Sequence, residues 1–165
     1  MKNISRWYCV RSHQWQLLLH LVLVLAGLAT VADMGKAQRL AILVAAPWEG
    51  ETAMHNDLVA IYDSLRQRGF APEECLVLEG PLTRSRLLAF LHDAQKRIAA
   101  WQRGDVWVSF SGHGTFRGTT AAEAQPGLLL TSALHPSHEE HVWWEEVFAA
   151  LQVPAAVQLT LLPDS

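Results

Sequence analysis

The chain has 165 residues, half of them hydrophobic and 18% charged, and a formal net charge of -3. This length is enough to bury the core of one domain. The charge excludes the basic surface that marks nucleic-acid-binding proteins, so nucleic acid is not expected as a partner. No glycine-rich phosphate loop follows the first apolar run, where Ala45-Ala-Pro-Trp-Glu-Gly50 stands instead. We therefore expect no nucleotide and no other cofactor.

Residues 1–37 have the pattern of an export signal. Lys2, Arg6 and Arg11 precede an apolar stretch over 17–31, and small residues suited to cleavage follow it. The stretch is shorter than the roughly 20 residues that a membrane-spanning helix needs. We therefore predict export to the periplasm or the cell exterior, with an uncleaved membrane anchor as the alternative.

The remaining residues, 38–165, are predicted to form one α/β domain. The continuous apolar run 39–46 is typical of a buried parallel strand. Three further segments rich in apolar residues, 74–78, 105–110 and 157–162, are also predicted as strands. Three segments with helical spacing of apolar residues cover 53–68, 83–100 and 143–151. Thr83 has the residue type and position of a helix N-cap. Alternation of strands and helices predicts a parallel sheet with helices on both faces, and 115–127 is predicted as a polar loop.

The chain has two cysteines, Cys9 and Cys75, which are too few for a disulfide framework. Cys75 lies in the predicted strand 74–78. We interpret it as a buried, unreactive thiol without a catalytic role.

The motif Ser111-Gly112-His113-Gly114 follows the predicted strand 105–110. Proteins of the α/β class keep their chemistry at the carboxyl ends of parallel strands. An imidazole can transfer a proton near neutral pH, and an unobstructed Gly114 amide can donate a hydrogen bond to an oxyanion. We therefore predict catalytic roles for His113 and Gly114, the alternative being a histidine in a surface turn.

This motif, together with other segments, resembles the caspase-like cysteine peptidases, especially the metacaspases and their bacterial relatives. The resemblance covers about residues 39–165. It is carried by the strand 40–45, by His55-Asn56-Asp57 with the helix that follows, by 106–114, and by 157–162 leading into Asp164-Ser165. It implies a caspase-like three-layer α/β/α sandwich with a mainly parallel sheet. It also implies a cysteine endopeptidase that cleaves protein or peptide substrates after arginine or lysine.

In that family the histidine works with a cysteine at the end of the next core strand, preceded by aspartate and then serine or alanine. Asp164 and Ser165 match the first two positions, which puts the expected nucleophile at position 166, one residue after the last residue of the sequence. Ser165 is not expected to replace it, because neighbouring side chains of an extended segment point in opposite directions. We therefore expect the sequence to be the large-subunit part of such an enzyme, incomplete at the C-terminus and inactive by itself.

A second hypothesis from a different class is a non-catalytic caspase-like pseudo-peptidase, or a truncated gene product, that acts by binding a partner. A partner chain that completes the sheet belongs to this expectation. A weaker alternative keeps the α/β fold but makes it a zinc hydrolase or a small-ligand binder.

The resemblance implies that Asp57 binds the arginine or lysine side chain of the substrate. The alternative is that Asp57 lies in the first turn of its helix and interacts with the helix dipole. Trp48 follows the first strand at the same sheet edge as His113, where it either borders the substrate cleft or packs within its loop.

His135, His138 and His141 are spaced by three residues. On a helix such neighbours share a face and are able to bind zinc. No partner that would orient these imidazoles toward a metal is evident, and the resemblance implies no metal there. We therefore predict a solvated polar loop and no metal site.

Overall fold

The computed structural model describes residues 38–130 and 137–164. These belong to one compact unit, Gln38–Ser165. The predicted export signal lies outside the described residues, as do His135 and Ser165. Among the helices of the described ranges, none has the length and apolar character required to cross a membrane.

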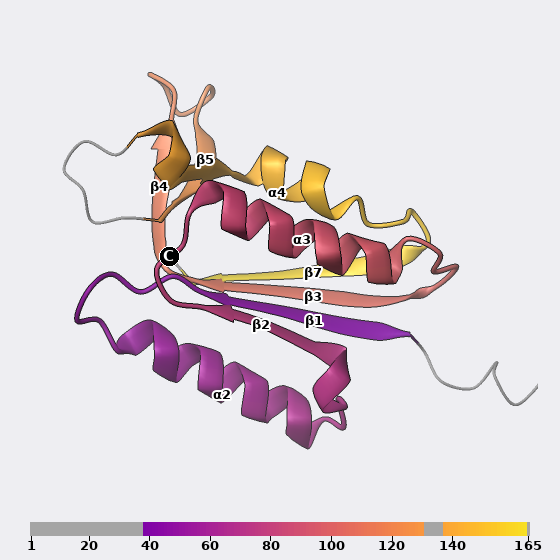
Figure 1. Cartoon of the computed structure of the whole chain (residues 1–165). Coiled ribbons are helices and arrows are strands. Elements are labelled where there is room, and N and C mark those ends of the chain that lie inside the picture. The colour runs from indigo at the N-terminus through magenta and orange to yellow at the C-terminus, as the bar shows by residue number, and fades with distance from the viewer. Residues whose placement is uncertain (1–37, 131–136, 165) are drawn as a thin grey trace, which may run out of the picture. The chain divides into compact units, whose positions relative to one another are not determined.

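Four parallel strands form the central sheet in the order β2-β1-β3-β7 (Figure 1). The strands are β1 (Arg39–Ala45), β2 (Cys75–Glu79), β3 (Gly104–Ser111) and β7 (Val157–Asp164). β1 lies between two partners and is buried over residues 40–45, which explains why its sequence is apolar without alternation. The four strands and their parallel arrangement confirm the predicted α/β class.

Helices cover both faces of this sheet (Figure 1). They are α2 (Ala53–Gln67), α3 (Arg84–Ile98) and α4 (Trp144–Leu151). α2 packs Met54, Leu58 and Leu65 against one face of β1, whereas the buried stripes of α3 and α4 belong to a larger core on the other face. The Thr83 hydroxyl accepts a hydrogen bond from the Arg86 amide, as the N-cap prediction required.

The prediction of a loop over 115–127 is wrong at both ends of that segment, where residues 115–117 and 125–127 belong to strands. A second, antiparallel sheet with the order β4-β5-β6 is present there. Its strands are β4 (His113–Arg117), β5 (Gln125–Leu129) and β6 (His141–Trp143). Most of the β4–β5 hairpin is exposed, so its apolar residues are confined to a short run at 128–130. The strand pairing itself has no signal in the local sequence. Two short 3₁₀ helices, η1 (Pro72–Glu74) and η2 (His138–Glu140), complete the described elements.

The register of the central sheet brings all four strand ends to one edge. Ala45 of β1 is opposite both Glu79 of β2 and Ser111 of β3, and Ser111 is opposite Asp164 of β7. We call this side the carboxyl edge and define it by these four residues. At this edge the chain leaves β3 and enters β4 at His113.

Candidate active site

His113 lies directly beyond the carboxyl edge, where the chain leaves β3 and enters β4. The connecting residue, Gly112, is buried, and its amide donates a hydrogen bond to the Asp164 carbonyl at 3.1 Å. A β-carbon on Gly112 would lie 2.6 Å from the Phe110 ring, closer than such atoms approach without a shift. Glycine is therefore required here by close packing, and this packing fixes the direction in which β4 presents His113.

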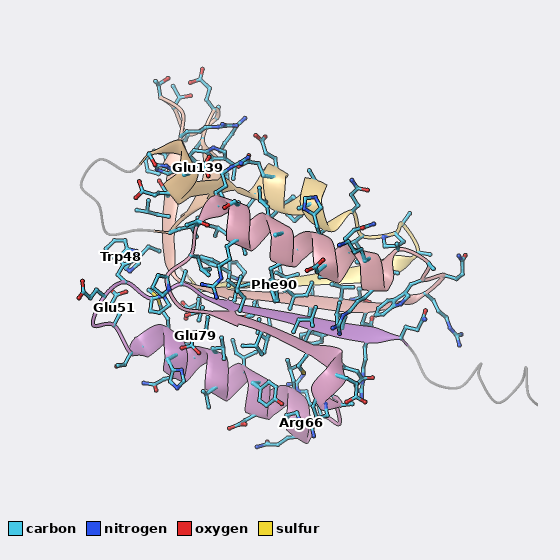
Figure 2. All side chains as sticks on the ribbon, viewed as in Figure 1. Trp48, Glu51, Arg66, Glu79, Phe90 and Glu139 are labelled. Carbon is cyan, nitrogen blue, oxygen red and sulfur yellow. The ribbon has the colours of Figure 1, made fainter. Side chains whose placement is uncertain are left out.

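The His113 imidazole is held by two residues of the loop after β1. Its Nε2 atom lies 3.1 Å from each carboxylate oxygen of Glu51. The Trp48 indole stacks on the imidazole with ring centroids 3.5 Å apart and an interplanar angle of 25°. Figure 2 labels Trp48 and Glu51 side by side in this loop. About a third of each side chain of the ion pair is exposed, 32% for His113 and 35% for Glu51, so the site is open to solvent.

A tight turn presents Glu51 to the imidazole. The Glu51 amide donates to the Trp48 carbonyl at 3.1 Å, and the Trp48 amide donates back to the Glu51 carboxylate at 2.8 Å. Gly50, at the third position of this turn, has a φ of 84°, which favours glycine. These contacts, first the Trp48 amide and then His113, lower the pKa of Glu51 from its ordinary value. Glu51 is therefore ionised at neutral pH and accepts hydrogen bonds only.

The Gly114 amide points away from β5. In an antiparallel ladder the amide and carbonyl of one residue face the same neighbouring strand, and successive residues alternate. The Leu130 amide donates to the Glu140 carbonyl at 2.9 Å, so the polar groups of Leu128, two residues earlier, also face β6. Leu128 is the register partner of Gly114. The Gly114 amide consequently faces the side of β4 that no strand of the described ranges occupies, where it is able to donate to a ligand.

Asp57 is joined to the same edge by a buried hydroxyl. Ser111 is 3% exposed, and its Oγ donates a hydrogen bond to the Asp57 carboxylate at 3.1 Å. The alternative that Asp57 acts on the helix dipole from the first turn is wrong, because α2 begins at Ala53 and has no acidic residue in that turn. The contact with Ser111, rather than a capping role, explains the position of this carboxylate.

One further pair lies at this edge. The His55 Nδ1 atom is 2.7 Å from a carboxylate oxygen of Glu79, and both side chains are partly exposed. Sequence reasoning gave a role to neither residue and also missed Glu51. The turn residues Pro47 and Gly50 are the only local signal near Glu51, and they predict a turn without identifying the histidine that it faces.

The structure keeps Cys75 away from His113. Cys75 is the first residue of β2 and is opposite Ala41, so it lies at the other end of the strand from Glu79 and the carboxyl edge. It is buried, at 9% exposure, and burial raises the pKa of its thiol. These findings agree with the interpretation of Cys75 as an unreactive core residue.

Of the three histidines spaced by three residues, the structure describes the side chain of His141 alone. His135 and the side chain of His138 lie outside what the structure describes. The His141 imidazole contacts the Ser137 carbonyl through Nδ1 at 2.9 Å and stacks on Trp143. Over 38–130 and 137–164, no group of three or more histidine, cysteine or acidic side chains is arranged to hold a metal ion.

No family model matches this chain, and neither does any curated protein.

Proposed function

We propose that Gln38–Ser165 is the histidine-bearing part of a caspase-like cysteine endopeptidase that cleaves after arginine or lysine. In this proposal His113 is the general base and acid, the Gly114 amide stabilises the oxyanion, and Asp57 binds the basic side chain of the substrate. The nucleophilic cysteine would stand at position 166, directly after Ser165.

The pairing of β3 with β7 is the observation that carries this proposal. Ser111 is opposite Asp164, and the hydrogen bond from the Gly112 amide to the Asp164 carbonyl continues the pairing past the end of β3. β3 ends two residues before His113, and β7 ends at Asp164, two residues before position 166, so the two segments leave the carboxyl edge at neighbouring points. A thiol at that position would therefore be next to the imidazole, as a nucleophile and its base need to be.

The chemistry follows from this neighbourhood. The imidazole of His113 takes the thiol proton, and the thiolate sulfur forms a bond to the carbonyl carbon of the scissile peptide. The Gly114 amide donates to the resulting oxyanion. When the carbon–nitrogen bond breaks, the leaving amine takes the proton from His113. Water then hydrolyses the thioester with His113 as base, which releases the carboxylic acid and restores the thiol.

Two acidic residues near Ser111 support the preference for a basic side chain. Asp57 contacts the Ser111 hydroxyl, and Asp164 is the register partner of Ser111. Register partners project to the same face of a sheet, so Asp164 shares with Asp57 the face that α2 covers. Carboxylates are the natural partners of a guanidinium or an ammonium group.

The test compares the chain ending at Ser165 with a chain translated through the natural reading frame beyond that codon, each checked by intact mass. We expect the longer protein to hydrolyse peptidyl-arginine and peptidyl-lysine amides that release a fluorescent amine. His113→Ala should abolish this hydrolysis. If the frame continues without cysteine at position 166, or if the longer protein is folded but inactive, the peptidase proposal is wrong and the pseudo-peptidase hypothesis replaces it.

A pair of variants tests the proposed role of Asp57 in substrate specificity. Asp57→Asn removes the charge at the proposed site, and Asp63→Asn removes one from an exposed position of the same helix. We expect Asp57→Asn to reduce kcat/KM for arginyl and lysyl substrates by about 10- to 100-fold, the cost of a lost charge-assisted hydrogen bond. Asp63→Asn should leave kcat/KM unchanged. Equal effects of the two variants would remove Asp57 from the substrate site.

A further inference from the structure

We propose that Glu51 is a positioning residue for His113: the carboxylate selects the tautomer in which Nε2 carries the proton and leaves Nδ1 as the basic atom. The catalytic meaning of this assignment rests on the proposed function. The contact between Glu51 and His113 is present in the 165-residue chain, and NMR tests it without a measurement of activity.

The assignment starts from the hydrogen-bonding capacity of the two groups. A carboxylate ion has no hydrogen to donate, and the Glu51 carboxylate already accepts from the Trp48 amide at 2.8 Å. Both of its oxygens lie 3.1 Å from the same imidazole atom, Nε2. The hydrogen between Glu51 and His113 must therefore be on Nε2. In the neutral imidazole the other nitrogen, Nδ1, is then an acceptor.

Trp48 supplies the second constraint. Its indole is stacked on the imidazole at 3.5 Å between centroids, so it covers one face of the ring and limits tilting. Rotation about the axis normal to the ring is opposed by the Glu51 hydrogen bonds. Proton transfer takes place in the plane of the ring, and neither contact obstructs Nδ1 in that plane. The pair thus fixes the orientation of the base while leaving its reactive atom accessible.

The loop is built to supply this carboxylate. The turn that closes from Trp48 to Glu51 has its left-handed position at Gly50, where φ is 84°. No atom lies within 4 Å of where a β-carbon of Gly50 would be, so packing does not require glycine there, whereas the backbone conformation of the turn favours it. The turn connects the ring-stacking residue and the carboxylate, and one short segment therefore provides both contacts to His113.

The test is nitrogen-15 NMR of the imidazoles in the full chain, with the His113 signals assigned through the His113→Gln variant. In the wild type we expect a protonated Nε2, with a hydrogen resonance that is observable because the hydrogen bond slows its exchange, and an unprotonated Nδ1. Glu51→Ala should abolish this Nε2 hydrogen resonance, because alanine offers no acceptor and the hydrogen then exchanges rapidly with water. Glu49→Ala, in the same turn and exposed, is the matched control and should retain it.

Protonation of Nδ1 in the wild-type neutral ring, or an Nε2 hydrogen resonance that survives in Glu51→Ala, would overturn the assignment. Amide spectra that overlay for the three proteins exclude unfolding as the cause of a loss. Glu51→Gln, whose side-chain carbonyl oxygen still accepts a hydrogen bond but carries no charge, is the second variant and should retain the resonance with faster exchange.

Peptidase activity of the protein extended past Ser165 tests the Glu51 assignment independently of the NMR measurement. There Glu51→Gln should lower kcat by about 10- to 100-fold with KM unchanged, a part of the contribution that general acid–base catalysis makes. If the extended protein is inactive while the NMR result is as expected, the peptidase proposal fails and the Glu51 assignment stands. If the extended protein is active and the wild-type ring carries its hydrogen on Nδ1, the peptidase proposal stands and the Glu51 assignment fails.

Discussion

The hydroxyl of Ser111 connects two elements by its hydrogen bond to the Asp57 carboxylate, 3.1 Å away. Ser111 ends β3 and is buried, whereas Asp57 belongs to α2 and is half-buried. The contact spans 54 residues of sequence. It fixes α2 relative to the carboxyl edge at the point where the proposed substrate side chain would enter.

Replacement of this hydroxyl is expected to destabilise the fold. Ser111→Ala removes a hydrogen bond to a charged group and leaves Asp57 with one partner fewer. We expect the free energy of unfolding to fall by about 1–2 kcal/mol. Urea denaturation followed by tryptophan fluorescence measures this change. Ser64→Ala, at an exposed position of α2, is the control and should have little effect. A loss no greater in Ser111→Ala than in Ser64→Ala would mean that the buried hydrogen bond contributes nothing net.

Gly112→Ala should be destabilising because of the Phe110 ring. The added β-carbon would lie 2.6 Å and 2.8 Å from two ring atoms, and overpacking of this kind costs about 1–3 kcal/mol. A double-mutant cycle identifies the cause: in a Phe110→Leu background the same glycine substitution should cost less, since the ring is gone. Thermal or urea unfolding of the four proteins gives the coupling. Additive effects would show that the clash with Phe110 is not responsible.

The contacts of Glu51 predict a pH dependence of stability. Because the folded-state pKa of this carboxyl is lowered below its ordinary value of 4.5, its contribution to stability is fully present above that value. The contribution is lost as the pH falls through the folded pKa. We therefore expect the stability difference between wild type and Glu51→Gln to shrink as the pH falls below about 4.5.

The measurement is urea unfolding of both proteins at a series of pH values. Asp93 and Glu123 also have lowered pKa values, from hydrogen bonds with Lys96 and Thr119 respectively. Their contributions are common to both proteins and cancel in the difference. A difference that stays constant down to about pH 3 would contradict the prediction.

Cys75 should behave as a core thiol that is independent of His113. In a Cys9→Ser background, labelling by an aromatic disulfide reagent should be slow in the native state and complete after unfolding, because burial restricts access and raises the pKa of this thiol. His113→Ala should not change the rate, since Cys75 begins β2 at the end away from the carboxyl edge. A rate that depends on His113 would mean that the two groups meet, and would reopen Cys75 as a candidate nucleophile.

Elements that are buried or capped have a local pattern in the sequence, whereas elements held by strand pairing do not. The unbroken apolar run of β1 predicts a strand buried on both faces, and the structure buries residues 40–45. The N-cap Thr83 likewise predicts the start of α3 within one residue. By contrast, the β4–β5 hairpin has only the short apolar run 128–130, and 115–127 is predicted as a loop, because most residues of the hairpin are exposed and are held by strand pairing and not by burial.

The candidate site also combines features that the sequence predicts with contacts that it does not predict. Local patterns predict the α/β class, the order of the core elements and the position of His113 after a core strand, because burial periodicity and turn residues act locally along the chain. The contacts of Glu51 and Trp48 with His113, the contact of Ser111 with Asp57 and the pairing of Asp164 beside them are visible only in the folded chain. These contacts join residues far apart in sequence through strand register and loop geometry, which no short-range pattern encodes.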